Sequence, residues 1–311
     1  LGVSDAMRDI ETMLRRVCDR TTPLLITGET GVGKEVCARF LHRISQRSKE
    51  PFIGVNCAAI PAGVMENELF GYKGTGVVGF HRGFAERARG GILFLDEVAE
   101  LPTQLQAKLL RLVETREFNR VGGEQLLQFH GRIVCSTNRD LTAAIQEGRF
   151  REDLYYRLNV LQIAIPPLRE RREEIPALVE TFLEKFGGEM QKPMLRLADE
   201  TLEYLLLYRW PGNVRQLANE IRRMVALTES GDTLLPSHLS KDIVATRRTI
   251  PVEPTEAVIR VAQPLGAATE QLERVSIERA LAACEGRNDE AAKLLGLSRK
   301  GLYLKRQRLK L

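Results

Sequence analysis

The sequence predicts an α/β fold, a parallel β-sheet with helices on both faces, followed by a small all-α domain and by a second all-α domain at the C-terminal end. Three observations predict it. Short apolar, β-branched runs alternate with helical stretches over residues 1–167, a pattern typical of a parallel sheet buried on both sides. Strand-like runs then stop, and apolar residues recur at helical spacing. The net positive charge, finally, is confined to the last part of the chain.

The apolar runs define five expected strands, and the segments after them define the other domains. The strands are expected at residues 24–26, 52–55, 92–95, 133–135 and 161–165. The sheet domain accordingly spans 1–167, and a helical domain without strands spans 168–242. A stretch with three prolines and little periodicity predicts a linker at 243–269, before the last helical domain at 270–311.

Composition bounds the possible functions. With 311 residues the chain has room for two or three domains. It contains no apolar run of the roughly 18 residues that a membrane span requires, and its five cysteines form no Cys-x-x-Cys pair. These features favour a cytoplasmic protein with small, buried cysteines and no contact with membranes. Leu1 stands where a complete protein would have Met, which indicates a piece of a longer chain.

A glycine-rich loop follows the first expected strand. It reads Gly28-Glu29-Thr30-Gly31-Val32-Gly33-Lys34 and opens a helical stretch. Glycines let backbone N–H groups close around phosphate oxygens, the helix N-terminus adds a positive dipole, and Lys34 can reach the outer phosphates. Strand, loop and helix in this order predict a site for ATP. Glu35 stands where a Ser or Thr hydroxyl usually contacts Mg²⁺, so the metal must depend on other groups and on water.

The third expected strand supplies those groups, because it ends in Asp96 and Glu97. A carboxylate at this place can hold Mg²⁺, directly or through water, and a second one can polarise an attacking water molecule. The sequence therefore predicts an ATPase with Asp96 as the metal ligand and Glu97 as the residue that activates water. A strand ending in ordinary surface acids is the alternative, and the phosphate loop argues against it.

These features belong to a wider resemblance. The chain resembles the central and C-terminal parts of bacterial enhancer-binding proteins, which are AAA+ transcriptional activators of the sigma-54 class. The resemblance covers nearly the whole chain, and it includes Glu35, since Glu is common at that position in the family. It rests on Gly28 to Glu35, Val55-Asn56-Cys57-Ala58-Ala59, Glu68-Leu69-Phe70-Gly71, Gly90 to Glu97, Arg120-Val121-Gly122-Gly123, Ser136-Thr137-Asn138, Phe150 to Leu158, Pro166 to Arg171 and Trp210-Pro211-Gly212-Asn213-Val214-Arg215.

The resemblance implies roles for residues around the nucleotide of the same subunit. Asn56 would hold Glu97 until ATP is in place. Thr137 and Asn138, at the end of the fourth strand, would sense the γ-phosphate. Arg215, in the helical domain that forms the lid, would sense the bound nucleotide.

The resemblance also implies an assembly, a ring that is expected to be a hexamer with its nucleotide sites at the boundaries between subunits. Arg151 and Arg157 would reach into the neighbouring subunit's site as arginine fingers, where they would stabilise the charge on the transferred phosphoryl group. From the residues alone, the two arginines are equally well interpreted as partners in surface salt bridges.

One segment departs from the family pattern. The family contacts sigma-54 with a loop that normally reads Gly-Ala-Phe-Thr-Gly-Ala and follows the Glu-Leu-Phe-Gly stretch. Here the corresponding residues 72–82 form a shorter segment without the Phe-Thr pair. Gly74, Gly76 and Gly79 predict a flexible, exposed loop, and Phe80 could offer an apolar contact. The sigma-contact loop is therefore atypical.

The positive charge lies at the C-terminal end. Residues 271–311 hold ten Lys and Arg and five Asp and Glu, which accounts for the whole net charge of +5. From Lys293 onward there are seven basic residues and no acidic one. Such a basic end is typical of a nucleic-acid contact, and a solvated charged tail is the alternative.

The helical pattern of this end predicts a helix-turn-helix. An amphipathic helix is expected from Glu270 to Cys284, a second one begins with Asn288 as its cap, and Gly296 breaks it. Ser298 then caps a basic helix. The arrangement resembles the Fis-type domain that closes most proteins of the family, and it implies a dimer on a two-fold site in double-stranded DNA. Contacts with DNA are expected from Ser298, Arg299, Lys300, Tyr303, Lys305 and Arg306, with Arg308 and Lys310 as further phosphate ligands.

Three functions remain open from the sequence. The first is a regulator that binds DNA, assembles into a ring and uses ATP hydrolysis to activate RNA polymerase with sigma-54. The second is a DNA-binding regulator that uses ATP to control its oligomeric state and acts through sigma-70 polymerase or as a repressor, since the loop at residues 72–82 is altered. A general AAA+ remodelling protein explains the C-terminal module less well.

Overall fold

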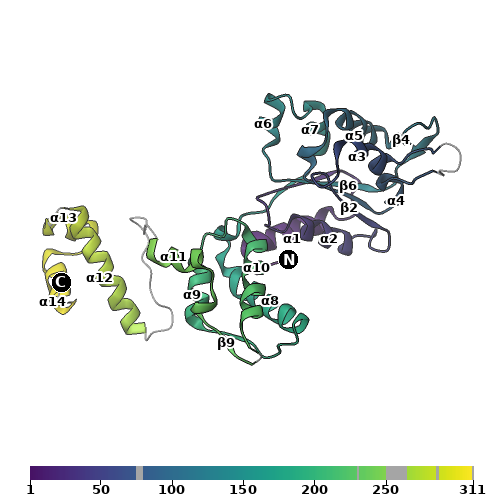
Figure 1. Ribbon diagram of the computed structural model, residues 1–311. Helices are drawn as coiled ribbons and strands as arrows, with labels where there is room; N and C mark the ends of the chain where they lie inside the picture. Colours follow the sequence, from purple (N-terminus) through teal and green to yellow (C-terminus); the bar gives the residue numbers. More distant parts are fainter. Residues whose placement is uncertain (75–79, 230, 250–264, 285–286, 310–311) are drawn as a thin grey trace. The chain divides into compact units, whose positions relative to one another are not determined.

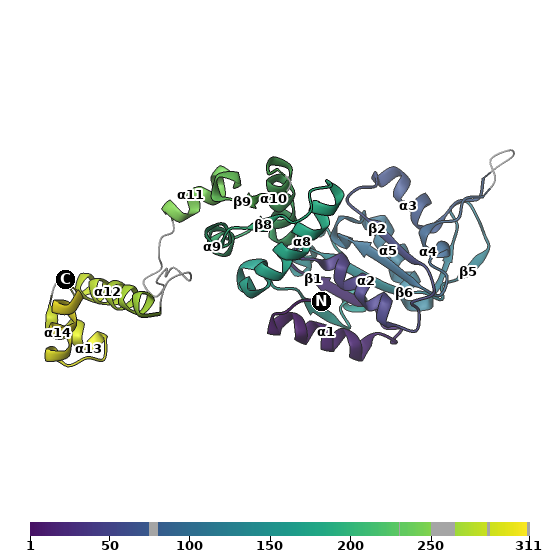
Figure 2. The same cartoon turned by 90° about the horizontal axis from the view of Figure 1, so that it is seen from below.

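The computed structural model describes residues 1–74, 80–229, 231–249, 265–284 and 287–309. The chain divides into two compact units, one of Leu1–Pro193 with Arg209–Glu229 and one of Met194–Tyr208 with Ser230–Leu311 (Figures 1 and 2). None of the helices in the described part of the chain combines the length and apolar character needed to cross a membrane.

The first unit contains the predicted parallel sheet. Its strands are β1 (Leu24–Thr27), β2 (Phe52–Asn56), β3 (Ile92–Asp96), β6 (Arg132–Thr137) and β7 (Gln162–Ala164), so all five predicted strands are confirmed. They pair in parallel in the order β2-β3-β6-β1-β7. The carboxyl ends of β1, β3 and β6 are therefore neighbours at one edge of the sheet, where parallel sheets commonly bind ligands.

Helices cover both faces of this sheet (Figure 1), as predicted. On one face, α1 (Asp5–Val17) and α2 (Lys34–Ile44) pack on strand residues that include Leu24 and Ile26. On the other face, α3 (Ala62–Phe70), α4 (Phe84–Arg87), α5 (Thr103–Thr115), α6 (Leu141–Gln146) and α7 (Glu152–Leu158) pack on residues that include Leu25 and Leu93. Side chains alternate between the two faces along each strand, and helices bury both faces. Polar side chains of the site therefore lie at the carboxyl edge of the sheet.

Smaller elements complete the first unit. A hairpin of β4 (Glu117–Asn119) and β5 (Leu126–Gln128) lies outside the main sheet, and its three-residue strands carry no pattern that the sequence could reveal. After β3 comes the short helix η1 (Val98–Glu100), and after β7 come η2 (Leu168–Glu170) and η3 (Arg172–Glu174). They lead into α8 (Ile175–Glu189), which packs against α10 (Asn213–Leu227).

The second unit is mostly helical. It holds α9 (Asp199–Leu207), η4 (Pro236–His238) and α11 (Lys241–Thr249), with a parallel pair of two-residue strands, β8 (Arg196–Leu197) and β9 (Thr233–Leu234). The expectation of no strands over 168–242 is wrong at this pair, which is too short to leave a periodic signal. The linker expected at 243–269 begins inside α11 and ends inside the next helix, and residues 250–264 lie outside the described part.

Three helices end the chain, α12 (Leu265–Ala283), α13 (Asn288–Leu294) and α14 (Arg299–Leu309). They share a small core of Ile277, Ala280, Ala291, Ala292, Leu302 and Leu309. Gly296, with φ of 65°, makes the turn between α13 and α14, as the sequence predicts. Together with the sheet and the helical segment after it, these helices confirm the predicted order of an α/β sheet followed by two mainly helical regions.

Candidate functional site

A pocket of about 430 Å³ opens at the carboxyl edge of the sheet in the first unit. Most of the residues around it are predicted site residues, and they come from the ends of three strands and from α10. Phe182, Val214 and Ala218 add an apolar wall that the sequence does not predict, and such a wall suits a nucleotide base. The lining comprises Thr30, Gly31, Gly33, Lys34, Glu35, Val36, Asn56, Asp96, Glu97, Phe182, Val214, Arg215 and Ala218.

The loop after β1 has the backbone of an anion site. Gly33 is the N-cap of α2 with φ of 108°, a conformation that side chains strongly disfavour. Gly31 has φ of 81°, and a Cβ atom there would lie 2.4 Å from the carbonyl oxygen of Gly212. The free N–H groups at the start of α2 therefore face the pocket without a side chain in the way.

Lys34 lies at the base of this loop and is only 7% exposed. Its Nζ donates to the carbonyl oxygens of Gly28 (2.9 Å) and Glu29 (3.3 Å) and lies 3.4 Å from Oε1 of Glu97. A buried ammonium requires such partners. Phosphate oxygens entering the pocket would compete with the Glu97 carboxylate for this charge.

Glu97 directly follows β3 in a left-handed conformation, with φ of 55°. This conformation costs a non-glycine residue about 1–3 kcal/mol, and such strain is concentrated at functional sites. Its Oε2 accepts a hydrogen bond from the backbone N–H of Asn138 (3.1 Å), and the side chain of Asn138 donates to Oγ1 of Thr30 (2.8 Å). Asn138 thus links the phosphate loop to Glu97, although it does not line the pocket itself.

The predicted contact between Asn56 and Glu97 is not present. Oδ1 of Asn56 instead accepts from the backbone N–H of Ala58 (2.9 Å), because a short Asn side chain readily closes a turn on its own backbone. Thr137 is buried and its Oγ1 accepts from the N–H of Arg139 (3.0 Å), and its role as a sensor of the γ-phosphate stays a prediction.

The pocket suits a Mg²⁺ that arrives with phosphates. No group of three or more His, Cys, Asp and Glu side chains converges anywhere in the described residues. Mg²⁺ is usually held by one or two carboxylates together with substrate phosphates and water, and Asp96 beside Glu97 offers that set. Oδ1 of Asp96 accepts a hydrogen bond from Ser136, a residue for which the sequence predicts no such role. Glu35 pairs with Arg39 at 2.7 Å.

A second cluster lies on the outer side of the phosphate loop. Arg169 donates to both carboxylate oxygens of Glu29 (2.9 and 2.7 Å), and Asn213 donates to one of them (3.0 Å). The hydrogen bonds from Arg169, and next the one from Asn213, lower the pKa of Glu29. These donors balance a negative charge that would otherwise lie beside a phosphate site.

The two predicted arginine fingers lie on or next to α7, and neither lines the pocket of its own chain. Arg151 pairs with Asp153 at 2.6 Å. Arg157 pairs with Glu114 at 2.7 Å, and its side chain is 62% exposed. Tyr156 and Val160 beside it are exposed apolar residues. Within one chain both arginines therefore form surface salt bridges, which is the alternative interpretation of these residues. Their action on the nucleotide of a neighbouring subunit stays a prediction.

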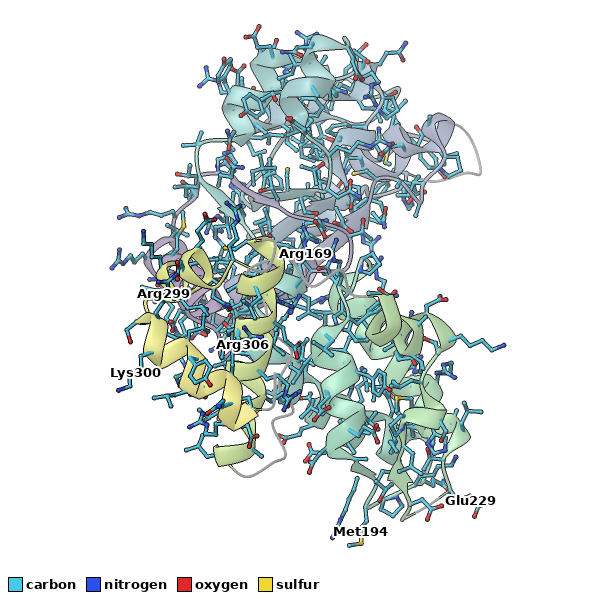
Figure 3. All side chains as sticks on the ribbon, turned by 90° about the vertical axis from the view of Figure 1, so that its left-hand side faces the viewer. Arg169, Met194, Glu229, Arg299, Lys300 and Arg306 are labelled. Atoms are coloured by element: carbon cyan, nitrogen blue, oxygen red, sulfur yellow. The ribbon has the colours of Figure 1, made fainter. Side chains whose placement is uncertain are left out.

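In the second unit, the predicted DNA-contacting side chains gather on α14. Oγ of Ser298 accepts from the N–H of Gly301 (3.0 Å), so Ser298 caps this helix as predicted. Arg299, Lys300 and Arg306 belong to α14 (Figure 3), and with Tyr303 they border a pocket of about 540 Å³. The basic and aromatic groups of one helix face therefore lie together, as contacts with a DNA groove require.

Asn288 departs from its predicted role, and Lys305 has an acidic partner that the sequence does not predict. The ammonium of Lys305 pairs with Glu273 of α12 at 2.5 Å, because position 305 lies close to the face that α14 turns toward α12. Asn288 is not the cap of α13, whose N-cap is Arg287, and its Oδ1 instead accepts from Arg306 (2.7 Å). Arg299 pairs with Asp289.

Comparison with known proteins gives the same order of domains. Three family models match, namely the sigma-54 interaction domain over residues 1–164, the AAA+ ATPase lid domain over 169–254, and the bacterial regulatory protein, Fis family, over 268–309. The three models follow one another in the order that the sequence predicts, and the lid model covers residues from both compact units of the structure.

Curated relatives extend along nearly the whole chain. The phenol regulator MopR of Acinetobacter guillouiae is 42% identical over 96% of the chain and 54% of its own length. The luminescence regulatory protein LuxO of Vibrio campbellii is 40% identical over 99% of the chain and 68% of its own length. The regulatory protein AtoC of Escherichia coli is 42% identical over 98% of the chain and 66% of its own length. The chain thus spans between about half and two thirds of these proteins.

A solved structure with the same fold binds adenine nucleotides. NtrX from Brucella abortus, crystallised with ADP and with ATP, is 34% identical with a TM-score of 0.74 over 100% of the chain and about 70% of its own length. Family models, relatives and fold agree, and the chain belongs to the sigma-54 activator family of AAA+ transcriptional regulators.

Proposed function

We propose that this chain is the ATP-hydrolysing and DNA-binding part of a transcriptional activator that acts on RNA polymerase carrying sigma-54. The observation that carries the proposal is the contact between Lys34 and Glu97 (3.4 Å) beside Asp96, at the mouth of a phosphate loop. The Fis-type helices at the C-terminal end support a role in transcription, and so do the relatives named as regulatory proteins.

The geometry supports a mechanism in which ATP rearranges charges that are already in place. In this mechanism Lys34 leaves Glu97 for the outer phosphates, and the backbone N–H groups of Gly31, Gly33 and Lys34 receive the remaining phosphate oxygens, since that of Val32 donates to the carbonyl of Glu29 (3.5 Å). Mg²⁺ held at Asp96 would neutralise phosphate charge when it is bound with ATP. Glu97, once free of Lys34, is placed to orient and polarise a water molecule, while Asn138 links its position to Thr30 of the loop.

The proposal includes a ring in which Arg157, and with it Arg151, acts on the neighbouring subunit's nucleotide. Both arginines are on the surface near exposed Tyr156 and Val160, an apolar pair that suits a subunit contact. An arginine that comes from a neighbour makes hydrolysis depend on assembly. The C-terminal helices would bind a two-fold DNA site as a dimer and raise the local concentration of subunits.

The second candidate function, action through sigma-70 polymerase or as a repressor, is favoured by the loop at residues 72–82. Its described base is an antiparallel pair, in which Tyr72 and His81 exchange backbone hydrogen bonds (3.1 and 3.0 Å) and stack their rings. Phe80 is exposed, with the guanidinium groups of Arg82 and Arg120 over its ring at 5.6 and 4.9 Å. Residues 75–79 lie outside the described part, and membership of the family favours sigma-54.

Promoter opening tests the proposal. Purified sigma-54 polymerase, promoter DNA and the protein are mixed with ATP, and melting is measured in a single round. We expect opening that requires ATP and is lost in Glu97→Gln. Intact ATP hydrolysis without any opening by sigma-54 polymerase would refute the sigma-54 activity and leave the second candidate.

A further inference from the structure

Three successive carbonyl groups of the phosphate loop accept hydrogen bonds from later segments of the chain. The oxygen of Thr30 accepts from Nδ2 of Asn213 (3.1 Å), and that of Gly31 accepts from the backbone N–H of Arg215 (3.3 Å). The oxygen of Val32 accepts from the guanidinium of Arg171 (2.7 Å). All three donors belong to segments that follow the sheet, and all lie in the first unit.

These bonds decide where the N–H groups of the loop point. A trans peptide is planar, so its C=O and the N–H of the next residue point in opposite directions. Fixing the carbonyls of Thr30 and Val32 therefore orients the N–H groups of Gly31 and Gly33, which line the pocket, whereas the N–H of Val32 donates to the carbonyl of Glu29 (3.5 Å). A phosphate loop needs its N–H groups turned inward, which requires its carbonyls to be turned outward and satisfied there.

The donors are themselves fixed by buried partners. Arg171 is 3% exposed, and its guanidinium also pairs with Glu174 at 2.8 Å. Glu174 in turn accepts from Oγ of Ser4, the N-cap of α1, at 2.6 Å. A charged pair in this surrounding holds its geometry only while each member keeps its hydrogen bonds. Helix α1 is thereby connected to the carbonyl of Val32.

Asn213 is equally well fixed. It is fully buried, its Oδ1 accepts from the backbone N–H of Leu168 (2.8 Å), and its φ is 50°. Asn tolerates this left-handed conformation better than most residues with a side chain. One amide therefore ties the start of α10 to the segment after β7 and to the phosphate loop.

We propose that Arg171 and Asn213 are positioning residues that orient the peptide groups of the phosphate loop for the phosphates of ATP. Neither residue lines the pocket, so both act through the loop backbone. The proposal rests on the proposed function, in that the loop binds ATP. It assigns part of the affinity for phosphates to the segments 168–174 and 212–215, outside the loop itself.

Asn213→Gly gives the sharpest test, because glycine accepts the left-handed backbone and only the amide is removed. Affinities of the whole chain for ATP, ADP and adenosine are measured by calorimetry, with adenosine as a competitor where its own heat is small. We expect ATP and ADP to bind about 10-fold more weakly, equivalent to about 1.4 kcal/mol. Adenosine, which has no phosphate, should keep its affinity within about twofold, since the apolar wall is unchanged.

Arg171→Met extends the test, and Arg172→Ala is its matched control. Arg172 is the exposed neighbour of Arg171 in η3, so its removal should leave all three affinities unchanged. Circular dichroism and thermal unfolding establish that each variant is folded. If Arg171→Met does not fold, Asn213→Gly decides alone.

The outcomes distinguish a loss of ATP binding by the protein from a loss of the positioning role of Asn213 and Arg171. A wild-type chain without affinity for ATP would overturn the proposed function. A wild-type chain that binds ATP, together with an Asn213→Gly variant of unchanged affinity for ATP and ADP, would overturn the positioning role. Equal losses for ATP and adenosine would also overturn it, because they would indicate a collapsed pocket instead of misdirected loop amides.

Discussion

The phosphate loop and helix α14 are the two segments to which we assign phosphate ligands, those of ATP for the loop and those of DNA for α14, and they differ in how their charges are held. In the loop, Lys34 is buried and three consecutive carbonyls are fixed by donors from elsewhere in the first unit. On α14, the side chain of Arg299 is 77% exposed and pairs with Asp289. The positive charge proposed to bind phosphate is therefore buried in the loop and exposed on α14.

The difference teaches where each affinity comes from. A buried site works through geometry fixed in advance, so a small displacement of one peptide is costly. An exposed basic helix works through the release of counter-ions, so its affinity depends on salt and on the number of charges. We therefore expect large, all-or-none effects around the loop and small, additive ones on α14.

The largest effect is expected for Arg157→Ala. In our proposal Arg157 completes the buried nucleotide site of the neighbouring subunit, and the substitution removes it from that site. Hydrolysis should fall about 10³-fold or more, because an arginine finger stabilises charge that develops only in the transition state, while ATP affinity changes little. Steady-state hydrolysis and ATP binding are measured on the same preparation.

Mixing then tests action between subunits. Arg157→Ala subunits retain an intact pocket and Lys34→Ala subunits retain the arginine, so a mixture should regain part of the activity that each lacks alone. Arg149→Ala, at an exposed arginine paired with Glu147, is the matched control. No recovery in the mixture would remove Arg157 from the neighbour's site.

Glu97→Gln is expected to have the next largest effect. Hydrolysis should fall about 10²–10⁴-fold, because the amide cannot polarise water as a carboxylate does. ATP should still bind, since Lys34 loses only a competing partner. Stopped-flow hydrolysis with labelled ATP checks this, and turnover close to that of the wild type would contradict the assigned role.

On α14, Lys300→Ala should weaken binding to all DNA sequences. Removal of one phosphate contact should reduce the slope of log K against log salt by about 0.9, which a titration at several salt concentrations measures.

Asp289→Asn should act in the opposite direction, with binding about two- to fivefold tighter, because Arg299 loses an exposed partner worth at most about 1 kcal/mol. Weaker binding by Asp289→Asn would indicate that the pair orients Arg299 for DNA.

The smallest effect is expected for Lys305→Ala. The pair of Lys305 with Glu273 should contribute about 0.2–1 kcal/mol to folding and nothing to the salt slope. Hydrogen bonds from Lys305 lower the pKa of Glu273, with Arg308 adding to the effect. This contribution to stability is therefore present above the unfolded pKa of the carboxyl and is lost as the pH falls through its lowered, folded value. A changed salt slope would return Lys305 to the DNA surface.

The sequence predicted the parts of the fold that carry periodic or local signals. The five strands, the phosphate loop and the carboxylates after β3 follow from apolar runs and from spacing within short motifs. The β4–β5 hairpin and the β8–β9 pair were missed because two or three residues show no period.

The positioning contacts could not be predicted from local pattern. Arg171 donates to the carbonyl of a residue 139 positions away, and Asn213 donates to the carbonyl of a residue 183 positions away. Because every residue type has a backbone carbonyl, the sequence does not indicate which one accepts. The resemblance placed the side chain of Asn56 on Glu97, whereas its Oδ1 accepts from the N–H of Ala58 in its own turn, a local contact that the resemblance does not predict. The catalytic and DNA-contacting roles stay predictions until they are measured.

The most direct test of the account is whether the protein binds purified sigma-54 in the presence of ADP and aluminium fluoride, which mimic the transition state of hydrolysis. We expect a stable complex that forms with this analogue, does not form with ADP alone, and is abolished in Lys34→Ala. Failure to bind sigma-54 with the analogue, in a protein that hydrolyses ATP and binds DNA, would contradict the central claim that hydrolysis at the buried site acts on sigma-54 polymerase.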